Sequence, residues 1–300
     1  MTQKNTVTRC GYVAIIGKPN VGKSTLINQS LNKKLVITSR KPQTTRHRIL
    51  GIKTTGNAQL LYLDTPGLHT KEKNILNQYM NRAARSVLHD VNIIVWLISR
   101  KQWNEDDEFV LKHLKQVKTP VILAINKIDQ LQSKEELLPF IDILKTKYSF
   151  ADIIPISAKK NLQIDVLEKS IIRHLPEQPF HYTTDKITTC NDAFVASEMI
   201  REKLIRLLGQ ELPYDTLVTI DALQNKSKIV NISATIFVNK PNQKPIVLGT
   251  KGDRLKRIGT QARLDLENFF EKKVFLKLWV KVKTNWANNA AFLDYLGHSS

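Results

Sequence analysis

The chain reads Gly17-Lys18-Pro19-Asn20-Val21-Gly22-Lys23-Ser24-Thr25 near its start, and this run is its most informative feature. It fits G-x-x-x-x-G-K-[ST], a glycine-rich loop whose backbone N–H groups close around phosphate oxygens. The apolar residues 12–16 suit a buried strand, and residues 26–31 carry apolar side chains at helical spacing. Because a helix N-terminus attracts anions, this order of elements predicts a phosphate site. There Lys23 can reach the β- and γ-phosphates, and the Ser24 hydroxyl can bind Mg²⁺.

A second segment, Asp64-Thr65-Pro66-Gly67, follows the strand-like residues 60–63. At a strand end opposite the phosphate loop, the Asp64 carboxylate can hold Mg²⁺ through a water molecule. The Gly67 N–H can sense the γ-phosphate. We therefore expect these four residues and the following Leu68 to line the nucleotide.

A third segment, Asn126-Lys127-Ile128-Asp129, follows the apolar residues 121–125 and resembles the guanine-recognition motif of GTPases. Asp129 can accept hydrogen bonds from the guanine N1–H and exocyclic amine. Adenine lacks both donors and would leave a buried carboxylate unpaired, so such a site discriminates strongly. The Lys127 stem can cover one face of the base, and Asn126 can tie this segment to the phosphate loop. A weaker motif, Ser157-Ala158-Lys159, places the Ala158 N–H to contact the guanine O6.

A switch segment is predicted at Gln43-Thr44-Thr45-Arg46-His47. The usual switch device is a hydroxyl that binds Mg²⁺ only when the γ-phosphate is present. Two adjacent threonines are candidates: Thr45 is preferred, and Thr44 is the alternative.

The residue that follows Gly67 is Leu68, where Ras-like proteins carry a glutamine that orients water. Leu68 cannot polarise water. Hydrolysis must therefore use backbone groups, a bound monovalent cation, another side chain or a partner. Asn20 lies where related GTPases hold a potassium ion, which makes it the candidate K⁺ ligand.

Composition and charge bound the class of protein. The chain has 300 residues and 42% hydrophobic content, enough to bury the cores of about two domains. No apolar run reaches the roughly 18–20 residues of a membrane span, and the start lacks the apolar core of a signal peptide. With only Cys10 and Cys190, we expect no disulfide framework and a reducing cytoplasm. The net charge of +19 predicts a polyanionic partner, nucleic acid first and anionic lipid second.

Strand-like and helix-like segments alternate up to about residue 175, which predicts an α/β fold with a doubly wound, largely parallel sheet. Two prolines in residues 175–181 mark a boundary. We expect a nucleotide-binding domain at residues 1–176, a linker at 177–188 and a second domain at 189–300. In that second domain the pattern predicts helices at 190–208 and 253–270 and strands at 217–221, 228–238 and 274–282. Residues 244–248 are expected to be extended or turn-forming, and a short helix follows residue 284. This order indicates an α+β domain.

The loop Gly249-Thr250-Lys251-Gly252 precedes the second of those helices. A G-x-x-G between an apolar segment and a basic helix resembles the loop of KH domains, which clamps the backbone of four nucleotides. The glycines allow close approach of the sugar-phosphate chain. Phosphate-pairing charge would come from Lys251, Arg254, Lys256 and Arg257.

On these residues the chain resembles the Era family of bacterial ribosome-assembly GTPases over nearly its whole length. In the first domain the resemblance rests on the phosphate loop, residues 39–49, Asp64-Thr65-Pro66-Gly67 and Asn126-Lys127-Ile128-Asp129. In the second it rests on the Gly249 loop, Ser197-Glu198-Met199-Ile200-Arg201-Glu202-Lys203, Glu211-Leu212-Pro213-Tyr214 and Leu278-Trp279-Val280-Lys281-Val282-Lys283. Two departures are small: Asp215 stands where relatives often have serine, and Asp253 lowers the positive charge beside the loop.

The resemblance implies hydrolysis of GTP to GDP with Mg²⁺, with catalytic roles for Lys23, Thr45 and Gly67. It implies a type II KH domain that binds small-subunit ribosomal RNA near its three-prime end and assists maturation of the small ribosomal subunit. It also implies a cytoplasmic protein with some peripheral contact with the anionic inner membrane, and we expect a monomer.

Two other functions compete with this interpretation. A membrane-surface GTPase would use the basic second domain on anionic lipid, but lipid binding needs no G-x-x-G clamp. A tRNA-modification GTPase would need a folate- or carbon-transfer domain and a C-terminal cysteine, and neither is evident in the sequence.

Overall fold

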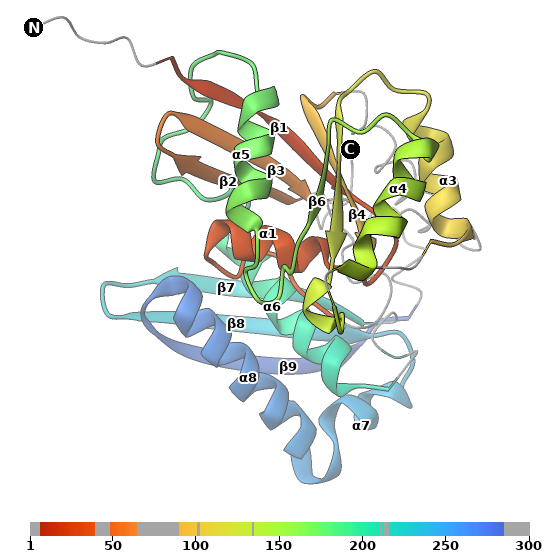
Figure 1. Cartoon of the computed structure of the whole chain (residues 1–300). Helices are drawn as coiled ribbons and strands as arrows, with labels where there is room; N and C mark the ends of the chain where they lie inside the picture. Colours follow the sequence, from red (N-terminus) through yellow and green to blue (C-terminus); the bar gives the residue numbers. More distant parts are fainter. Residues whose placement is uncertain are drawn as a thin grey trace, which may run out of the picture. The chain divides into compact units, whose positions relative to one another are not determined.

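The computed structural model describes residues 7–39, 49–64, 90–100, 103–133, 135–209, 212 and 216–284. The chain forms two compact units, which Figure 1 shows in sequence colours. The first unit comprises Met1–Val36 and Thr45–Thr189, and the second comprises Ile37–Thr44 and Cys190–Ser300. Residues 177–188, predicted as a linker, thus belong to the first unit. There the Gln59 side-chain oxygen accepts hydrogen bonds from the backbone N–H groups of His181 and Tyr182, at 3.0 Å each.

The first unit is built on a six-stranded sheet in the order β2-β3-β1-β4-β5-β6. Every neighbouring pair is parallel except the edge pair β2 and β3. This confirms the doubly wound, parallel-rich sheet predicted from the alternation of strands and helices. The strands are β1 Arg9–Ile16, β2 Ile49–Thr55, β3 Ala58–Asp64, β4 Ile93–Ser99, β5 Val121–Asn126 and β6 Asp152–Pro155.

Both faces of this sheet are buried, as a parallel sheet requires. Ala14 and Ile16 of β1 share a core cluster with residues of α3 and α4, while Val13 and Ile15, which point the opposite way, are equally buried. The connections also contain the short 3₁₀ turns η1 Ile128–Gln130 and η2 Glu135–Leu137. The helices of this unit are α1 Lys23–Leu31, α3 Glu105–Leu114, α4 Leu138–Lys147 and α5 Ile164–His174.

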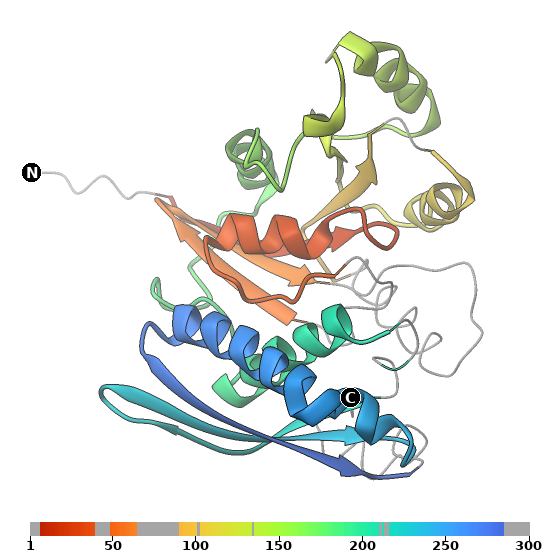
Figure 2. The same ribbon diagram turned by 90° about the horizontal axis from the view of Figure 1, so that it is seen from below.

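The second unit is an α+β fold with a three-stranded sheet in the order β7-β8-β9. Strands β7 and β8 are antiparallel, and β8 and β9 are parallel. Figure 2 shows α6 and α8 on one face of this sheet. The element order confirms the KH-type arrangement: α6 Asp192–Leu207, β7 Thr216–Asn225, β8 Ile229–Val238, α7 Gln243–Leu248, η4 Thr250–Gly252, α8 Asp253–Phe270 and β9 Lys273–Val282.

The prediction for residues 244–248 was wrong, because this segment is the helix α7. The Gln243 side-chain oxygen accepts hydrogen bonds from the N–H groups of Asn239 and Lys240, both at 2.9 Å, and so closes the turn before the helix. Pro245 stands in the first turn, where a missing N–H costs no intrahelical bond. The proline is therefore compatible with this short helix. The helix predicted after Thr284 lies outside the described residues.

Helix α6 carries a buried charged network in the second unit. Glu202 is fully buried and accepts hydrogen bonds from the Thr38 N–H at 2.9 Å and from Arg206 at 2.9 Å. Lys203 donates to Glu202 at 2.9 Å and also contacts Asp265. Burial alone would lower the pKa of Lys203, but these two carboxylates raise it overall. The network thus holds Thr38, which precedes the predicted switch segment, against α6.

Every helix in the described part of the chain is too short or too polar to span a bilayer.

Candidate nucleotide site and nucleic-acid loop

The loop between β1 and α1 folds around the Lys23 side chain. Its ammonium donates hydrogen bonds to the carbonyl oxygens of Gly17 at 2.9 Å and Lys18 at 3.0 Å. Gly22 begins the helix with φ 110°, and a Cβ there would lie 2.3 Å from the Asn126 Nδ2 atom. Only glycine meets both demands, which explains its place in the motif. Pro19 and Thr25 lie at the turn and in the first turn of α1.

Lys23, Ser24 and Asp64 converge at the carboxyl edge of the sheet, because parallel strands β1 and β3 end there. The Ser24 hydroxyl lies 3.4 Å from the Asp64 carboxylate, and Asp64 is fully buried. A hydroxyl and a carboxylate are oxygen donors of the kind that Mg²⁺ prefers, so these residues fit that ion. Burial lowers the pKa of Lys23 to about 8, although the nearby Asp64 carboxylate raises it.

Asn126 joins three loops that are distant in the sequence. Its side-chain NH₂ donates to the Val21 carbonyl at 2.7 Å. Its side-chain oxygen accepts from the N–H groups of Lys127 at 2.8 Å and Ala158 at 2.9 Å. The predicted tie between the third segment and the phosphate loop is therefore present as a hydrogen bond. The guanine O6 contact of the Ala158 N–H stays a prediction.

Asp129 is held at the mouth of the site by Ser157. The Ser157 hydroxyl donates to Asp129 Oδ1 at 2.6 Å and accepts from the Lys160 N–H at 3.2 Å. The Lys127 ammonium donates to the Asn20 carbonyl at 2.8 Å, which lays the lysine stem between the two loops. Burial, followed by the charges of Arg100 and Lys18, lowers the pKa of Lys127. Asn20 and Lys159 are exposed.

One residue of this site escaped the sequence reasoning. Asp107 is fully buried at the start of α3 and forms an ion pair with Lys18 at 2.8 Å, so it anchors the phosphate loop to that helix. Its N–H donates to the Asn104 side chain while its own carboxylate accepts from the Asn104 N–H. The sequence did contain a signal for this position, because an asparagine followed three residues later by an acidic residue is typical of a capping box at the start of a helix.

Several predicted site residues lie outside the described residues. They include both switch threonines and the residues that follow Asp64: Thr44, Thr45, Thr65, Pro66, Gly67 and Leu68. Their roles stay predictions.

In the second unit, the loop at 249–252 links α7 to α8. Gly249 has φ 74°, and a Cβ there would lie 2.7 Å from the Arg254 Cβ. The Arg254 guanidinium donates to the Ile246 carbonyl at 2.5 Å, so this arginine braces the loop as well as adding charge. Gly252, also predicted to contact nucleic acid, is half-buried, and the remaining residues of that set are exposed: Thr250, Lys251, Lys256 and Arg257.

Two different family models match the two parts of the chain. Residues 12–127 match the family described as 50S ribosome-binding GTPase, and residues 211–287 match the KH domain. GTPase Era of Coxiella burnetii (strain Dugway 5J108-111) is 53% identical over 290 residues, covering 97% of this chain and 98% of that protein. GTPase Era of Marinobacter nauticus is 50% identical over 296 residues, covering 99% and 97%.

Two solved structures resemble the chain over nearly its full length. The crystal structure of a single-residue variant of Aquifex aeolicus Era bound to GDP.AlF4⁻ gives a TM-score of 0.92 at 37% identity, covering 98% of this chain and 100% of that one. The structure of Era in complex with MgGDPNP and nucleotides 1506–1542 of 16S ribosomal RNA gives 0.91 at 38% identity, with the same coverage.

Proposed function

The chain is a GTPase of the Era family, and we propose that it binds small-subunit ribosomal RNA near the three-prime end and assists small-subunit maturation. The observation that carries the RNA part is the G-x-x-G loop at the start of α8, in which Thr250 and Lys251 are exposed and which is followed by the exposed cations Lys256 and Arg257. The related Era structure that holds nucleotides 1506–1542 of 16S ribosomal RNA supports the same partner. We further propose a cytoplasmic monomer whose net charge of +19 allows peripheral contact with the anionic inner membrane.

In the nucleotide site, the backbone N–H groups of the phosphate loop and the Lys23 ammonium hold the β- and γ-phosphates. Ser24, Thr45 and, through water, Asp64 would hold Mg²⁺, and the ion would supply positive charge beside the phosphate oxygens. The Gly67 N–H contacts the γ-phosphate, so Thr45 and Gly67 respond to its presence. Since Leu68 cannot orient water, we propose that Asn20 would hold a potassium ion, which would supply additional positive charge.

At the base, Asp129 accepts hydrogen bonds from guanine while Lys127 covers one face. Asn126 fixes the position of the base-binding residues relative to the phosphate loop, because its side-chain amide is hydrogen-bonded to both the Val21 carbonyl and the Ala158 N–H. In the second unit, Lys251, Lys256 and Arg257 pair with phosphates beside the glycines, while Arg254 keeps the loop in place.

Crosslinking in cells tests the RNA partner. The full chain is crosslinked to RNA by ultraviolet light, purified, and the attached RNA is sequenced. We expect enrichment of the three-prime segment of small-subunit ribosomal RNA. Enrichment of tRNA in place of that segment contradicts the proposal.

Nucleotide affinity is expected to fall as pH rises above about 8. Below pH 8 the Lys23 amine is already protonated in the nucleotide-free protein. Above pH 8 it is neutral, so Lys23 must take up a proton when the nucleotide binds, and this weakens binding. The dissociation constant for GDP should therefore be level below pH 8 and rise about tenfold per pH unit above it. Calorimetric titration measures both the affinity and the proton uptake. The matched control is Lys23→Arg, whose side chain stays charged throughout this pH range. In that variant the dissociation constant should change with pH only as far as the guanine base of GDP itself titrates. An equal pH dependence in the two proteins contradicts the role given to the Lys23 ammonium.

The potassium proposal predicts faster GTP hydrolysis in potassium than in sodium salts. Asn20→Ala should erase the difference between the salts. Asn32→Ala is the matched control, because Asn32 also has a positive φ, 50° against 63° for Asn20. Phosphate release in each salt measures the rates, and equal parental rates in both salts exclude potassium assistance.

A further inference from the structure

One face of the three-stranded sheet in the second unit is free of helices among the described elements. Leu276, Leu278 and Val280 of β9 and Ala234 and Ile236 of β8 belong to the core cluster beneath α6 and α8. Side chains alternate along a strand, so the residues between them point to the opposite face. Figure 2 shows that this outer face turns away from both helices.

The edge strand β9 presents alternating cations and aromatic rings on this outer face. Phe275 is 53% exposed and Trp279 is 55% exposed, and three lysines, Lys273, Lys277 and Lys281, stand on either side of them. Phe275 and Trp279 thus leave two aromatic rings open to solvent among lysines, and this combination suits the stacking of bases. The even-numbered residues of the strand already account for its packing, so the rings are not needed for the core.

The neighbouring strand continues the pattern. Thr235 pairs with Trp279 and Phe237 pairs with Lys281 in the parallel register. The Lys283 ammonium lies 5.9 Å from the centre of the Phe237 ring. Among the described residues of the three strands, the acidic group on this side is Asp221, which accepts a hydrogen bond from the Thr235 hydroxyl at 2.7 Å. Because this single carboxylate is hydrogen-bonded to a hydroxyl and is outnumbered by the lysines, this part of the face keeps a net positive charge.

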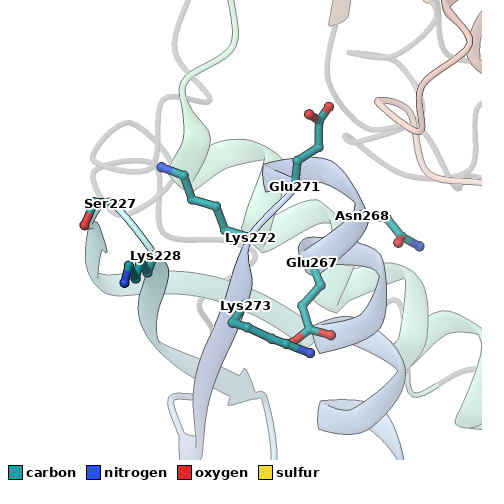
Figure 3. Close-up of a pocket in the computed structure, with 7 residues that line it drawn as sticks. All are labelled: Ser227, Lys228, Glu267, Asn268, Glu271, Lys272 and Lys273. Atoms are coloured by element: carbon teal, nitrogen blue, oxygen red, sulfur yellow. The ribbon is translucent and has the colours of Figure 1, made fainter.

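The other end of β9 is less suited to a polyanion. There an open hollow of about 500 Å³ lies between the β7–β8 turn and the α8–β9 turn. Figure 3 shows that Glu267 and Glu271 stand among Lys228, Lys272 and Lys273 in its walls. The Lys272 ammonium is also engaged by the Asn225 side chain at 2.8 Å. The net positive, aromatic part of the outer face therefore runs from Phe275 to Lys281.

We propose that this face is a second contact surface for single-stranded RNA, separate from the loop at 249–252. Bases stack on Phe275 and Trp279, and Lys277 and Lys281 pair with the phosphates between them. Aromatic rings on an open sheet face combined with cations hold unpaired bases without sequence preference. The two rings are four residues apart, which spaces them by about 13 Å along the strand. The proposal rests on RNA being the polyanionic partner, and it lengthens the bound segment beyond what the loop clamps.

Fluorescence anisotropy with the full chain and two labelled polyuridine strands tests the surface. The short strand has about four nucleotides, the length that a KH loop clamps, and the long one has about sixteen. Phe275→Ala and Trp279→Ala should each weaken binding of the long strand by about 5- to 150-fold and leave the short strand unchanged. Trp279→Phe, which keeps a ring, should restore most of the affinity. Lys277→Ala should reduce the log–log salt slope for the long strand by about 0.7.

The matched control is Leu264→Ala, which removes an exposed apolar side chain of α8, 50% exposed, and should bind as the parent does. Parental affinity of Trp279→Ala for the long strand overturns the proposal, whatever the loop does. Normal binding by Gly252→Asp with loss in Trp279→Ala overturns the loop assignment and leaves the sheet surface standing. If Trp279→Ala instead loses only flotation with phosphatidylglycerol vesicles, or only self-association in sedimentation, the face binds lipid or a second copy and the RNA surface is refuted.

Discussion

Asp129→Asn is expected to weaken GTP binding by about 30- to 700-fold and to make xanthosine triphosphate the better ligand. The loss of a charged, two-point contact to guanine corresponds to about 2–4 kcal/mol. The contacts of Asp129 explain why the base preference should reverse rather than merely weaken. The Ser157 hydroxyl donates to Oδ1, and its oxygen accepts from the Lys160 N–H. In the variant the amide oxygen keeps this partner, so the NH₂ group faces the base. Guanine offers donors there, and xanthine offers a carbonyl oxygen.

The measurement is competition of both triphosphates against a fluorescent guanine nucleotide. The control is Asp165→Asn, which removes another exposed carboxylate of the first unit, one that lies 3.8 Å from Lys169 on α5. That variant should bind GTP as the parent does. Unchanged GTP affinity in Asp129→Asn would defeat the assignment of guanine recognition to this residue.

Gly252→Asp is expected to abolish binding of short single-stranded RNA while GTP binding and basal hydrolysis persist. Gly252 has φ 82°, a conformation that aspartate tolerates better than most residues, and a Cβ there meets nothing within 4 Å. The fold should therefore survive. The new side chain would instead occupy the space that the sugar-phosphate backbone needs, and its charge would repel phosphate. Stimulation of hydrolysis by RNA, where the parent has it, should disappear with binding.

Gly56→Asp is the matched control for this variant. Gly56 lies in the β2–β3 turn of the first unit with φ 55°, and nothing lies within 4 Å of a Cβ there. Gly56→Asp therefore has the same added charge and a similar backbone strain as Gly252→Asp, but at a site far in sequence from the loop at 249–252. A gel-shift titration with the short strand should show loss for Gly252→Asp and parental affinity for Gly56→Asp. Equal affinity of the two variants would mean that the loop is not the clamp.

The regular elements were predictable to within a few residues where the pattern is local and strong. The helix expected at 253–270 is α8 at Asp253–Phe270, and the alternation that predicted a strand at 274–282 gives β9 at Lys273–Val282. Residues 244–248 were predicted to be extended or turn-forming, but they belong to the six-residue helix α7, and the turn before this helix is closed by the Gln243 side chain. Side-chain closure of a turn has no periodic signature.

The phosphate loop, the guanine motif and the KH loop could be predicted from the sequence, since each is a contiguous run of a few residues. How those runs meet depends on the tertiary structure. Asn126 reaches Val21, 105 positions away, and Lys18 reaches Asp107, 89 positions away. Such partners depend on the order of strands in the sheet, which brings the carboxyl ends of β1, β3 and β5 to one edge. The exposure of Phe275 and Trp279 was likewise settled by tertiary packing: alternation assigns a residue to a face, but only the placement of helices determines which face stays open.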